Sequence, residues 1–241
     1  TTQRFTWNLN FNIAYNQNKI LKLSNSADSA AQNQLVGHIA GGTGNTIQIN
    51  TVGYPAYTFY VYKQVYDPTG HPIEGVYEDV NNDPNNLFYR YKSPDPKVTL
   101  GFSSQFSYQH WTLSFVARAD IGNYVYNNVL STMDTYNSIS NSLGYIGNAS
   151  TDYLFTKFQN SQYFSDYYVE NASFLRMDNI TLGYNFGTIA HSRVQLAVNA
   201  FVQNAFVITK YRGLNPEVFG GIDNNVYPIP RTYALGLNIH F

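Results

Sequence analysis

Few side chains in this sequence are spaced for chemistry, and the clearest are the oxygen-bearing residues Asp79, Asn81 and Asp83. Alternating Asp and Asn side chains supply the first ligands of a calcium-binding loop. Such a loop continues with a glycine and ends on a bidentate Glu, whereas this chain has Pro84 and Arg90 at those positions. Two interpretations therefore stay open, a calcium site or an Asp/Asn-rich turn.

No arrangement of residues typical of catalysis accompanies this segment. The five histidines, at positions 38, 71, 110, 191 and 240, lack the spacing of metal ligands, and the chain has no cysteine. Neither a Gly-x-Ser-x-Gly nucleophile turn nor a phosphate-binding loop occurs. The sequence therefore predicts that the protein is not an enzyme, and that calcium is the one cofactor to consider.

The composition narrows the class of protein further. The chain has 241 residues and a net charge of −1, with 12% charged and 17% aromatic side chains. The high aromatic content excludes a disordered chain, and the lack of a basic surplus argues against a nucleic-acid binder. Apolar runs are too short for a transmembrane helix. Low charge with many Tyr and Asn residues favours a protein whose outer surface contacts something other than water.

Strict alternation of apolar and polar residues identifies the elements. It runs from Phe5 to Tyr15 and indicates a strand with one apolar and one polar face. Similar patterns predict roughly eight strands and no convincing amphipathic helix. The predicted strands cover 5–15, 45–52, 57–65, 98–108, 111–121, 180–186, 194–203 and 232–241.

The connections between these strands favour a membrane barrel. Short joins are expected near 53–56, 109–110 and 187–192, and long ones rich in Asn, Gly, Pro, Ser and Tyr at 16–44, 66–96, 122–170 and 205–230. Short turns on one side and long loops on the other are typical of an antiparallel outer-membrane β-barrel. The apolar face would meet lipid and the polar face a wet lumen. Arg118 with Asp120, and Arg176 with Asp178, would form ion pairs in the lumen or at its rim.

Three segments carry a family resemblance. Residues 168–184 (YVENASFLRMDNITLGY), 203–217 (QNAFVITKYRGLNPE) and 227–241 (YPIPRTYALGLNIHF) resemble the end of the barrel of SusC/RagA-like TonB-dependent outer-membrane transporters. The resemblance implies a 22-stranded barrel of which this chain holds about the last eight strands. The plug domain would lie further N-terminal, so the chain is expected to be the C-terminal piece of a longer protein.

The same resemblance implies a function and partners. Members of the family import glycans or peptides across the outer membrane of Gram-negative bacteria. They work with a SusD-like surface lipoprotein, and with TonB through the plug. Long extracellular loops would contact substrate and lipoprotein, with Tyr124, Tyr126, Tyr211 and Tyr227 as candidate contacts because their rings can stack on sugar or pack on peptide.

The last strand is a candidate assembly signal. Tyr233, Leu235, Leu237, Ile239 and Phe241 share one face, and resemblance to outer-membrane proteins implies that the barrel-assembly machinery reads this face. A terminal strand also offers free backbone groups for β-augmentation.

Two other functions stay open at this stage. A stand-alone small barrel could act as an adhesin, a structural protein or a pore, because eight strands can close alone. In that case strand 5–15 would pair with 231–241, whereas in a fragment one side of strand 5–15 would stay unpaired. A soluble sugar-binding β-domain is a weaker third possibility.

Overall fold

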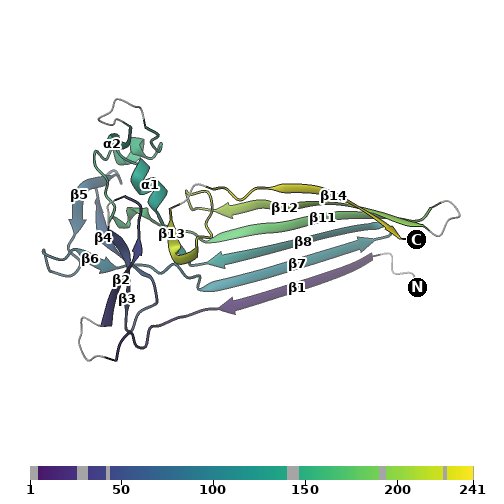
Figure 1. The fold of residues 1–241 in the computed structure, drawn as a ribbon, viewed down its shortest axis with the longest axis horizontal. Coiled ribbons are helices and arrows are strands. Elements are labelled where there is room, and N and C mark those ends of the chain that lie inside the picture. Colours follow the sequence, from purple (N-terminus) through teal and green to yellow (C-terminus); the bar gives the residue numbers. More distant parts are fainter. Residues whose placement is uncertain are drawn as a thin grey trace.

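The computed structural model describes residues 5–25, 32–41, 44–139, 147–189, 194–224 and 227–240. It is largely antiparallel β-structure, as the alternation predicts, and has two parts (Figure 1). A long sheet occupies one part, and a cap of smaller sheets and short helices occupies the other. Among the described residues, none of the helices has the length and apolar character needed to cross a membrane.

The long sheet contains six strands in the order β1-β7-β8-β11-β12-β14. Every neighbouring pair is antiparallel. The strands are β1 (Phe5–Tyr15), β7 (Val98–Tyr108), β8 (Trp111–Ile121), β11 (Phe174–Thr188), β12 (Gln195–Thr209) and β14 (Thr232–His240).

The cap contains two smaller sheets. One has the order β2-β3-β4-β5, with β6 paired to β4, and the other has the order β10-β9-β13. The cap strands are β2 (Asn33–His38), β3 (Thr46–Thr51), β4 (Thr58–Tyr66), β5 (Pro72–Glu78), β6 (Phe88–Arg90), β9 (Tyr124–Asn127), β10 (Val169–Asn171) and β13 (Ile222–Asp223). The helical segments are α1 (Asn128–Met133), α2 (Tyr136–Ile139), α3 (Tyr153–Thr156), η2 (Asp166–Tyr168) and η3 (Phe219–Gly221).

Two of the eight predicted strands lie in the cap. The segments predicted at 45–52 and 57–65 form β3 and β4, so the long sheet has six strands within the described ranges. The join at 53–56 consequently lies within the cap, which corrects its grouping with the short turns of the barrel. Alternation of apolar and polar residues indicates a strand with one apolar face, but it does not indicate which sheet that strand joins.

The registers bring most of the apolar residues of the six long strands onto one face. One cross-strand row reads Trp7, Phe106, Leu113, Leu182, Ala200 and Leu235. A row on the opposite face reads Thr6, Ser107, Thr112, Gly183, Asn199 and Gly236. Because side chains alternate along every strand, the sheet has one apolar and one polar face over its whole width.

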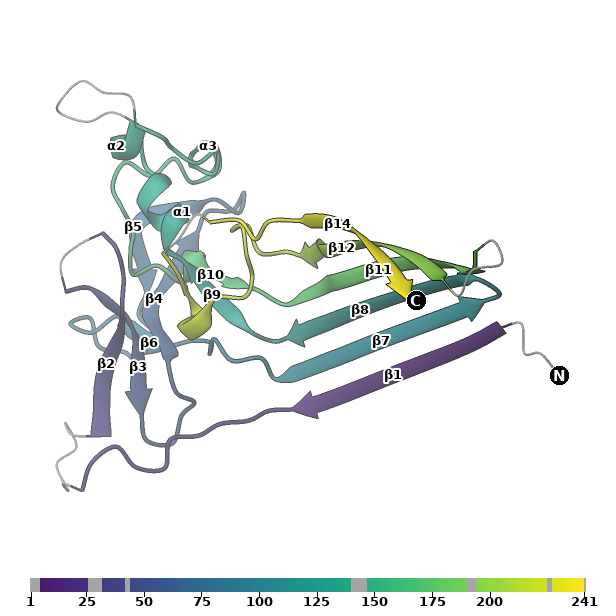
Figure 2. The same ribbon diagram turned by 45° about the vertical axis from the view of Figure 1, so that its right-hand side comes forward.

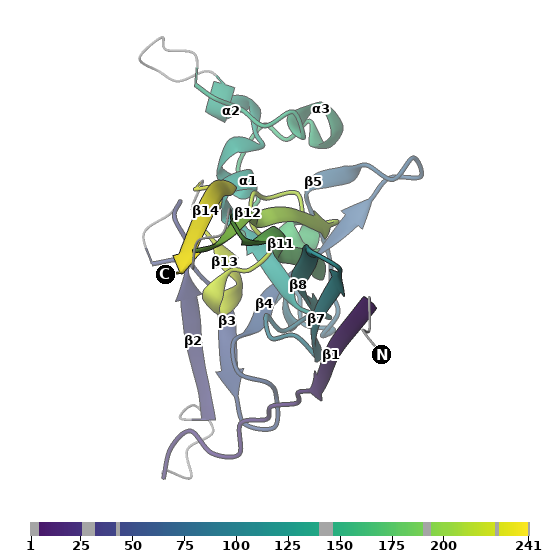
Figure 3. The ribbon, with the colours of Figure 1, turned by 90° about the vertical axis from the view of Figure 1, so that its right-hand side faces the viewer.

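The sheet is curved and open. Seen along its strands, it follows an arc, and the connection from β12 to β14 lies on the inner side of that arc (Figure 3). The polar residues Arg118 and Arg176 contact Glu217 of this connection, so the polar face is the concave one. β1 and β14 are the two edges of the sheet and do not pair with each other among the described residues.

All long connections of this sheet leave from the same end (Figure 2). Residues 16–97 join β1 to β7, residues 122–173 join β8 to β11, and residues 210–231 join β12 to β14. Together they build the cap. The strands are joined at the other end by the turn 109–110 and the connection 189–194.

Candidate functional site

An aromatic core holds the cap together. Phe59, Val61, Tyr126, Phe158 and Tyr168 are all fully buried in one cluster that joins the β2–β6 sheet to the segment 122–170. Tyr126 and Tyr168 meet edge to face at 6.1 Å between ring centroids, a favourable arrangement for aromatic pairs. The cap is therefore a packed body with a core of its own.

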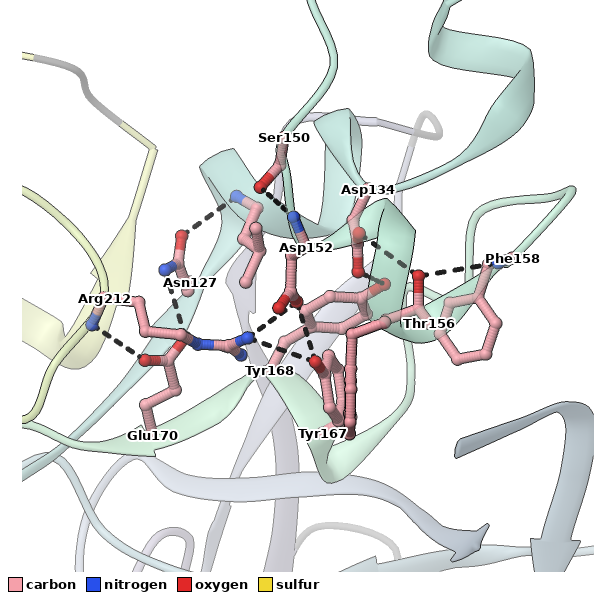
Figure 4. A network of polar contacts seen from close by, with 12 residues as sticks. Asn127, Asp134, Ser150, Asp152, Thr156, Phe158, Tyr167, Tyr168, Glu170 and Arg212 are labelled. Atoms are coloured by element: carbon pink, nitrogen blue, oxygen red, sulfur yellow. Dashed lines mark hydrogen bonds and ion pairs between the residues drawn. The ribbon is translucent and has the colours of Figure 1, made fainter. Parts of the chain in front are cut away.

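Arg212 ties three parts of the cap together (Figure 4). Its guanidinium lies 2.6 Å from Asp152 Oδ2 and 3.1 Å from Glu170 Oε1, and it covers the ring of Tyr167 at 5.0 Å. Its backbone N–H also donates to Glu170 Oε2 at 3.0 Å. Burial lowers the pKa of Arg212, but the charge and hydrogen bond of Glu170 together with the contacts to Tyr167 outweigh this effect, so the net pKa lies above the ordinary value and the side chain stays charged.

A third carboxylate, Asp134, lies beside this network (Figure 4). It is buried and accepts hydrogen bonds from Thr156 Oγ1 at 3.2 Å and from the Tyr168 hydroxyl at 3.4 Å. Burial and the nearby charge of Asp152 raise the pKa of Asp134 to about 7. This carboxyl group therefore keeps its proton to a higher pH than an exposed aspartate does.

Two of the clefts that the described residues form involve the cap. The larger, of about 940 Å³, lies where β1, β7 and β8 end and the cap begins, and Arg90, Lys92, Tyr91 and Tyr124 are among the residues that line it. The smaller, of about 530 Å³, includes Tyr91 and Asp166 in its wall. A cleft of the larger size falls within the range of small-ligand sites in proteins.

A cluster of charged side chains lies on the polar face of the long sheet. Arg118 and Arg176 stand directly opposite each other on β8 and β11, an unfavourable pairing of like charges. A register shift between Met177 and Asn179 accompanies the pairing of Asp178 with Arg118 at 2.9 Å. Glu217 pairs with both arginines, at 2.8 Å from Arg176 Nε. The predicted ion pairs on this face therefore form between elements instead of along single strands.

The predicted contact tyrosines differ in position. Tyr126 is fully buried and donates to the carbonyl of Tyr163, and Tyr211 is 5% exposed and donates to Asp223. This placement corrects the expectation that these two would contact a ligand, because their rings are enclosed by the cap. Tyr124 is half-buried in the wall of the larger cleft, and Tyr227 is exposed.

The Asp79 segment forms a self-bonded turn. Asp79 Oδ1 accepts from the backbone N–H groups of Asn81 and Asp83, at 3.1 and 3.0 Å. The Asn81 side-chain amide donates to the carbonyl of Phe88 at 2.6 Å. These contacts use the first carboxylate to order the loop. In the part of the chain that the structure describes, no group of three or more His, Asp and Glu side chains could hold a metal ion.

The assembly-signal residues lie on the edge of the long sheet. Tyr233, Leu235, Leu237 and Ile239 are exposed on the apolar face of β14, while Phe241 lies outside the described residues. The sequence analysis missed the larger cleft and its cations. The run Phe88-Tyr89-Arg90-Tyr91-Lys92, in which cations alternate with tyrosines, is the one local signal of it.

The curated proteins to which the chain is similar are TonB-dependent receptors. No family model matches the chain. It is 40% identical over its whole length to the TonB-dependent receptor SusC of Bacteroides thetaiotaomicron, of which it covers 25%. It is also 27% identical over its whole length to the TonB-dependent receptor P3 of Formosa agariphila, of which it covers 27%. The chain therefore spans about a quarter of the length of the curated relatives it matches.

The fold has solved counterparts. The chain superimposes on a structure of the RagAB peptide transporter with a TM-score of 0.74, over 99% of this chain and 28% of the other. A second RagAB structure, of the importer in an open state, gives 0.73. Sequence identity in both is below 25%, so these matches show a shared fold.

Proposed function

Because this chain is SusC/RagA-like along its whole length, we propose that it forms part of the barrel wall and outer cap of a TonB-dependent outer-membrane transporter. The complete protein would import glycans or peptides. By the same resemblance, its partners would be a SusD-like surface lipoprotein and TonB, the latter acting through a plug outside this chain. The named relatives are receptors and transporters. This supports a protein that recognises a substrate and lets it pass through the membrane, instead of one that catalyses a reaction.

The apolar face of the long sheet, which carries no charged side chain, is the observation on which this proposal rests. Six strands in register present apolar residues on one side with no charged side chain, and a mainly polar surface on the other. A lipid-facing surface requires such a face, and a wet lumen suits its opposite. Each strand also has nine to fifteen residues, enough to cross the hydrocarbon layer at a tilt.

The open edges favour a segment of a larger barrel over a stand-alone one. β1 pairs with β7 and β14 pairs with β12, which leaves one side of each edge strand without a partner among the described residues. A barrel must close, because unpaired backbone groups are very costly in lipid. Further strands of a larger barrel would supply the missing partners.

The topology can be tested with single cysteines, because this chain has none of its own. In the full-length protein, with any other cysteines removed, Thr69→Cys would mark the cap and His110→Cys the short turn at the other end. A membrane-impermeant maleimide should label Thr69→Cys on intact cells, and His110→Cys only after the outer membrane is permeabilised.

The opposite labelling pattern would reverse the orientation. Equal labelling of both positions on intact cells would contradict insertion across the membrane.

Uptake of nutrients by the complete protein is tested in a separate growth experiment. Loss of the complete protein, or of TonB, should abolish growth on one of a panel of glycans and peptides as sole nutrient. Growth on every member of the panel would refute an importing role.

A further inference from the structure

The larger cleft has well-fixed walls. The Asn16 N–H donates to the carbonyl of Lys97 at 2.8 Å, which joins the segment after β1 to the segment before β7. Asn18 Oδ1 accepts from the N–H of Ala56 at 2.9 Å, and the Gly53 N–H donates to the carbonyl of Ile20 at 2.8 Å. These bonds attach the β3–β4 turn to the same wall. The cleft is therefore formed by bonded segments and not by a loose gap between loops.

The larger cleft has an excess of positively charged side chains, whereas the chain as a whole has a net charge of −1. Lys19, Arg90, Lys92 and Lys97 line it, and Asp95 is the one acidic residue among the lining side chains. Four of the 14 Lys and Arg residues of a chain with net charge −1 thus gather at a single cleft. Asp95 is bonded by the Asn18 side chain. In the described part of the chain, none of these four cations has a carboxylate within ion-pair distance.

Tyrosine rings hold two of these cations in place. The Arg90 guanidinium lies over the rings of Tyr54 and Tyr60, at 4.8 and 5.6 Å. The Lys92 ammonium lies over Tyr91 and Tyr124, at 5.1 and 5.4 Å. Contacts of this kind attract a cation but leave its charge uncompensated.

Arg90 also has unused hydrogen-bonding capacity. Its Nη2 donates to Thr51 Oγ1 at 3.0 Å, while its Nε is buried and has no hydrogen-bond partner. A buried N–H without a partner is costly, so such groups in native proteins call for an explanation. An anion bound in the cleft would add an acceptor to a side chain that already carries a free positive charge.

We infer that this cleft binds an anionic glycan, with carboxylate or sulfate groups on the Lys and Arg side chains and sugar rings on the tyrosines. The inference rests on the proposed function and specifies its substrate class. Tyr54 and Tyr124 line the cleft, so the ring face that Arg90 or Lys92 leaves uncovered can meet the apolar face of a sugar, while Asn16 and Gln17 add amides for hydroxyl groups. The volume of about 940 Å³ leaves room for a short oligomer.

The test measures binding to the purified full-length protein in detergent. Four polymers of similar length serve as probes: polygalacturonate, dextran sulfate, neutral dextran and polyglutamate. We expect the two anionic glycans to bind at least about tenfold more tightly than dextran and polyglutamate. Affinity should fall between about 0.1 M and 1 M salt, where the screening length shortens from about 10 Å to 3 Å.

Variants assign the binding to the cleft. The double variant Lys92→Gln with Lys97→Gln should weaken polygalacturonate binding at least about fivefold, and the exposed Lys210→Gln, outside the cleft, should leave it unchanged. Tyr54→Ala should also weaken it, because this change removes a ring face and the support of Arg90.

Several outcomes would overturn the inference. Dextran binding as tightly as polygalacturonate would remove the role of charge, and polyglutamate binding as tightly would assign the cleft to acidic peptides. Equal loss in Lys210→Gln would show non-specific attraction, and full affinity in Tyr54→Ala would exclude ring stacking. A protein that is labelled as a barrel and supports growth on a neutral glycan, yet binds no polyanion, would refute this inference and leave the proposed function standing.

Discussion

Leu9 and Asn10 form a matched pair for testing which face of the long sheet meets lipid. They are neighbours at the centre of β1, and their side chains point to opposite faces. Leu9 belongs to the apolar face, and Asn10 on the polar face donates to Ser103 Oγ at 3.3 Å. We expect Leu9→Arg to destabilise the barrel strongly and Asn10→Arg to have little effect.

The magnitude follows from strand geometry. Eleven residues at about 3.4 Å each, tilted by about 40°, span roughly 28 Å along the membrane normal, close to the apolar band of about 25 Å. Leu9 is one residue from the centre and hence within about 3 Å of the midplane. Arginine facing lipid there costs about 2–4 kcal/mol, or roughly 30- to 900-fold in the unfolding equilibrium. Asn10→Arg loses one exposed hydrogen bond, at most about 1 kcal/mol.

The assay is denaturant unfolding of the full-length protein refolded into lipid vesicles. Leu113 and Thr112 provide a graded second pair, because Leu113 is third of the 11 residues of β8 and lies nearer the short-turn end. Leu113→Arg should therefore cost less than Leu9→Arg. Equal destabilisation by Leu9→Arg and Asn10→Arg, or a greater loss from Asn10→Arg, would show that the apolar face does not contact lipid.

Three further predictions concern the cap and the last strand. Arg212→Gln should destabilise the cap by about 1–3 kcal/mol, because it leaves Asp152 and Glu170 without their cation, and protease resistance of the cap should fall, whereas Lys210→Gln should change neither. The raised pKa of Asp134, about 7, means that the folded cap holds a proton between about pH 4 and pH 7 that the unfolded chain has lost, so stability should decline as pH rises through that range; amide protection factors in residues 128–139, which divide the intrinsic exchange rate by the observed rate at the same pH, should be higher at pH 5 than at pH 8, and the same decline of the protection factors with pH in Asp134→Asn would contradict the assignment. Deletion of Phe241 in the full-length protein should lower its outer-membrane level and leave periplasmic aggregates or degradation products; normal assembly of the deletion variant would remove both the targeting role and the interface role of this residue.

Local sequence patterns were sufficient for the strands and for their two faces. The predicted bounds 5–15, 98–108 and 111–121 coincide with β1, β7 and β8. Alternation is a property of consecutive residues, so no knowledge of pairing is needed to recognise it. The predicted strand 180–186 covers only part of β11, which begins at Phe174. The register shift near Asp178 interrupts the alternation of apolar and polar residues there.

Pairing, burial and the cleft depend on contacts between distant segments. The less regular alternation at 45–52 and 57–65 predicts strands but not the sheet that they join, and only tertiary structure placed β3 and β4 in the cap. The same holds for Tyr126 and Tyr211, because a tyrosine in a polar segment can be a surface contact or a core residue, and the choice depends on what packs around it. The short helices of the cap are too brief to show an apolar period.

The sequence by itself determined that the chain is a two-faced β-structure and that it resembles outer-membrane transporters. The tertiary structure decided which six of the described strands form the long sheet, that β1 and β14 each have one unpaired side within the described ranges, and that the cations of the larger cleft come together from residues 19, 90, 92 and 97. The physical reason is range: a strand pattern is set by neighbouring residues, whereas the charge of a cleft is the sum over segments that only folding brings within one screening length of each other.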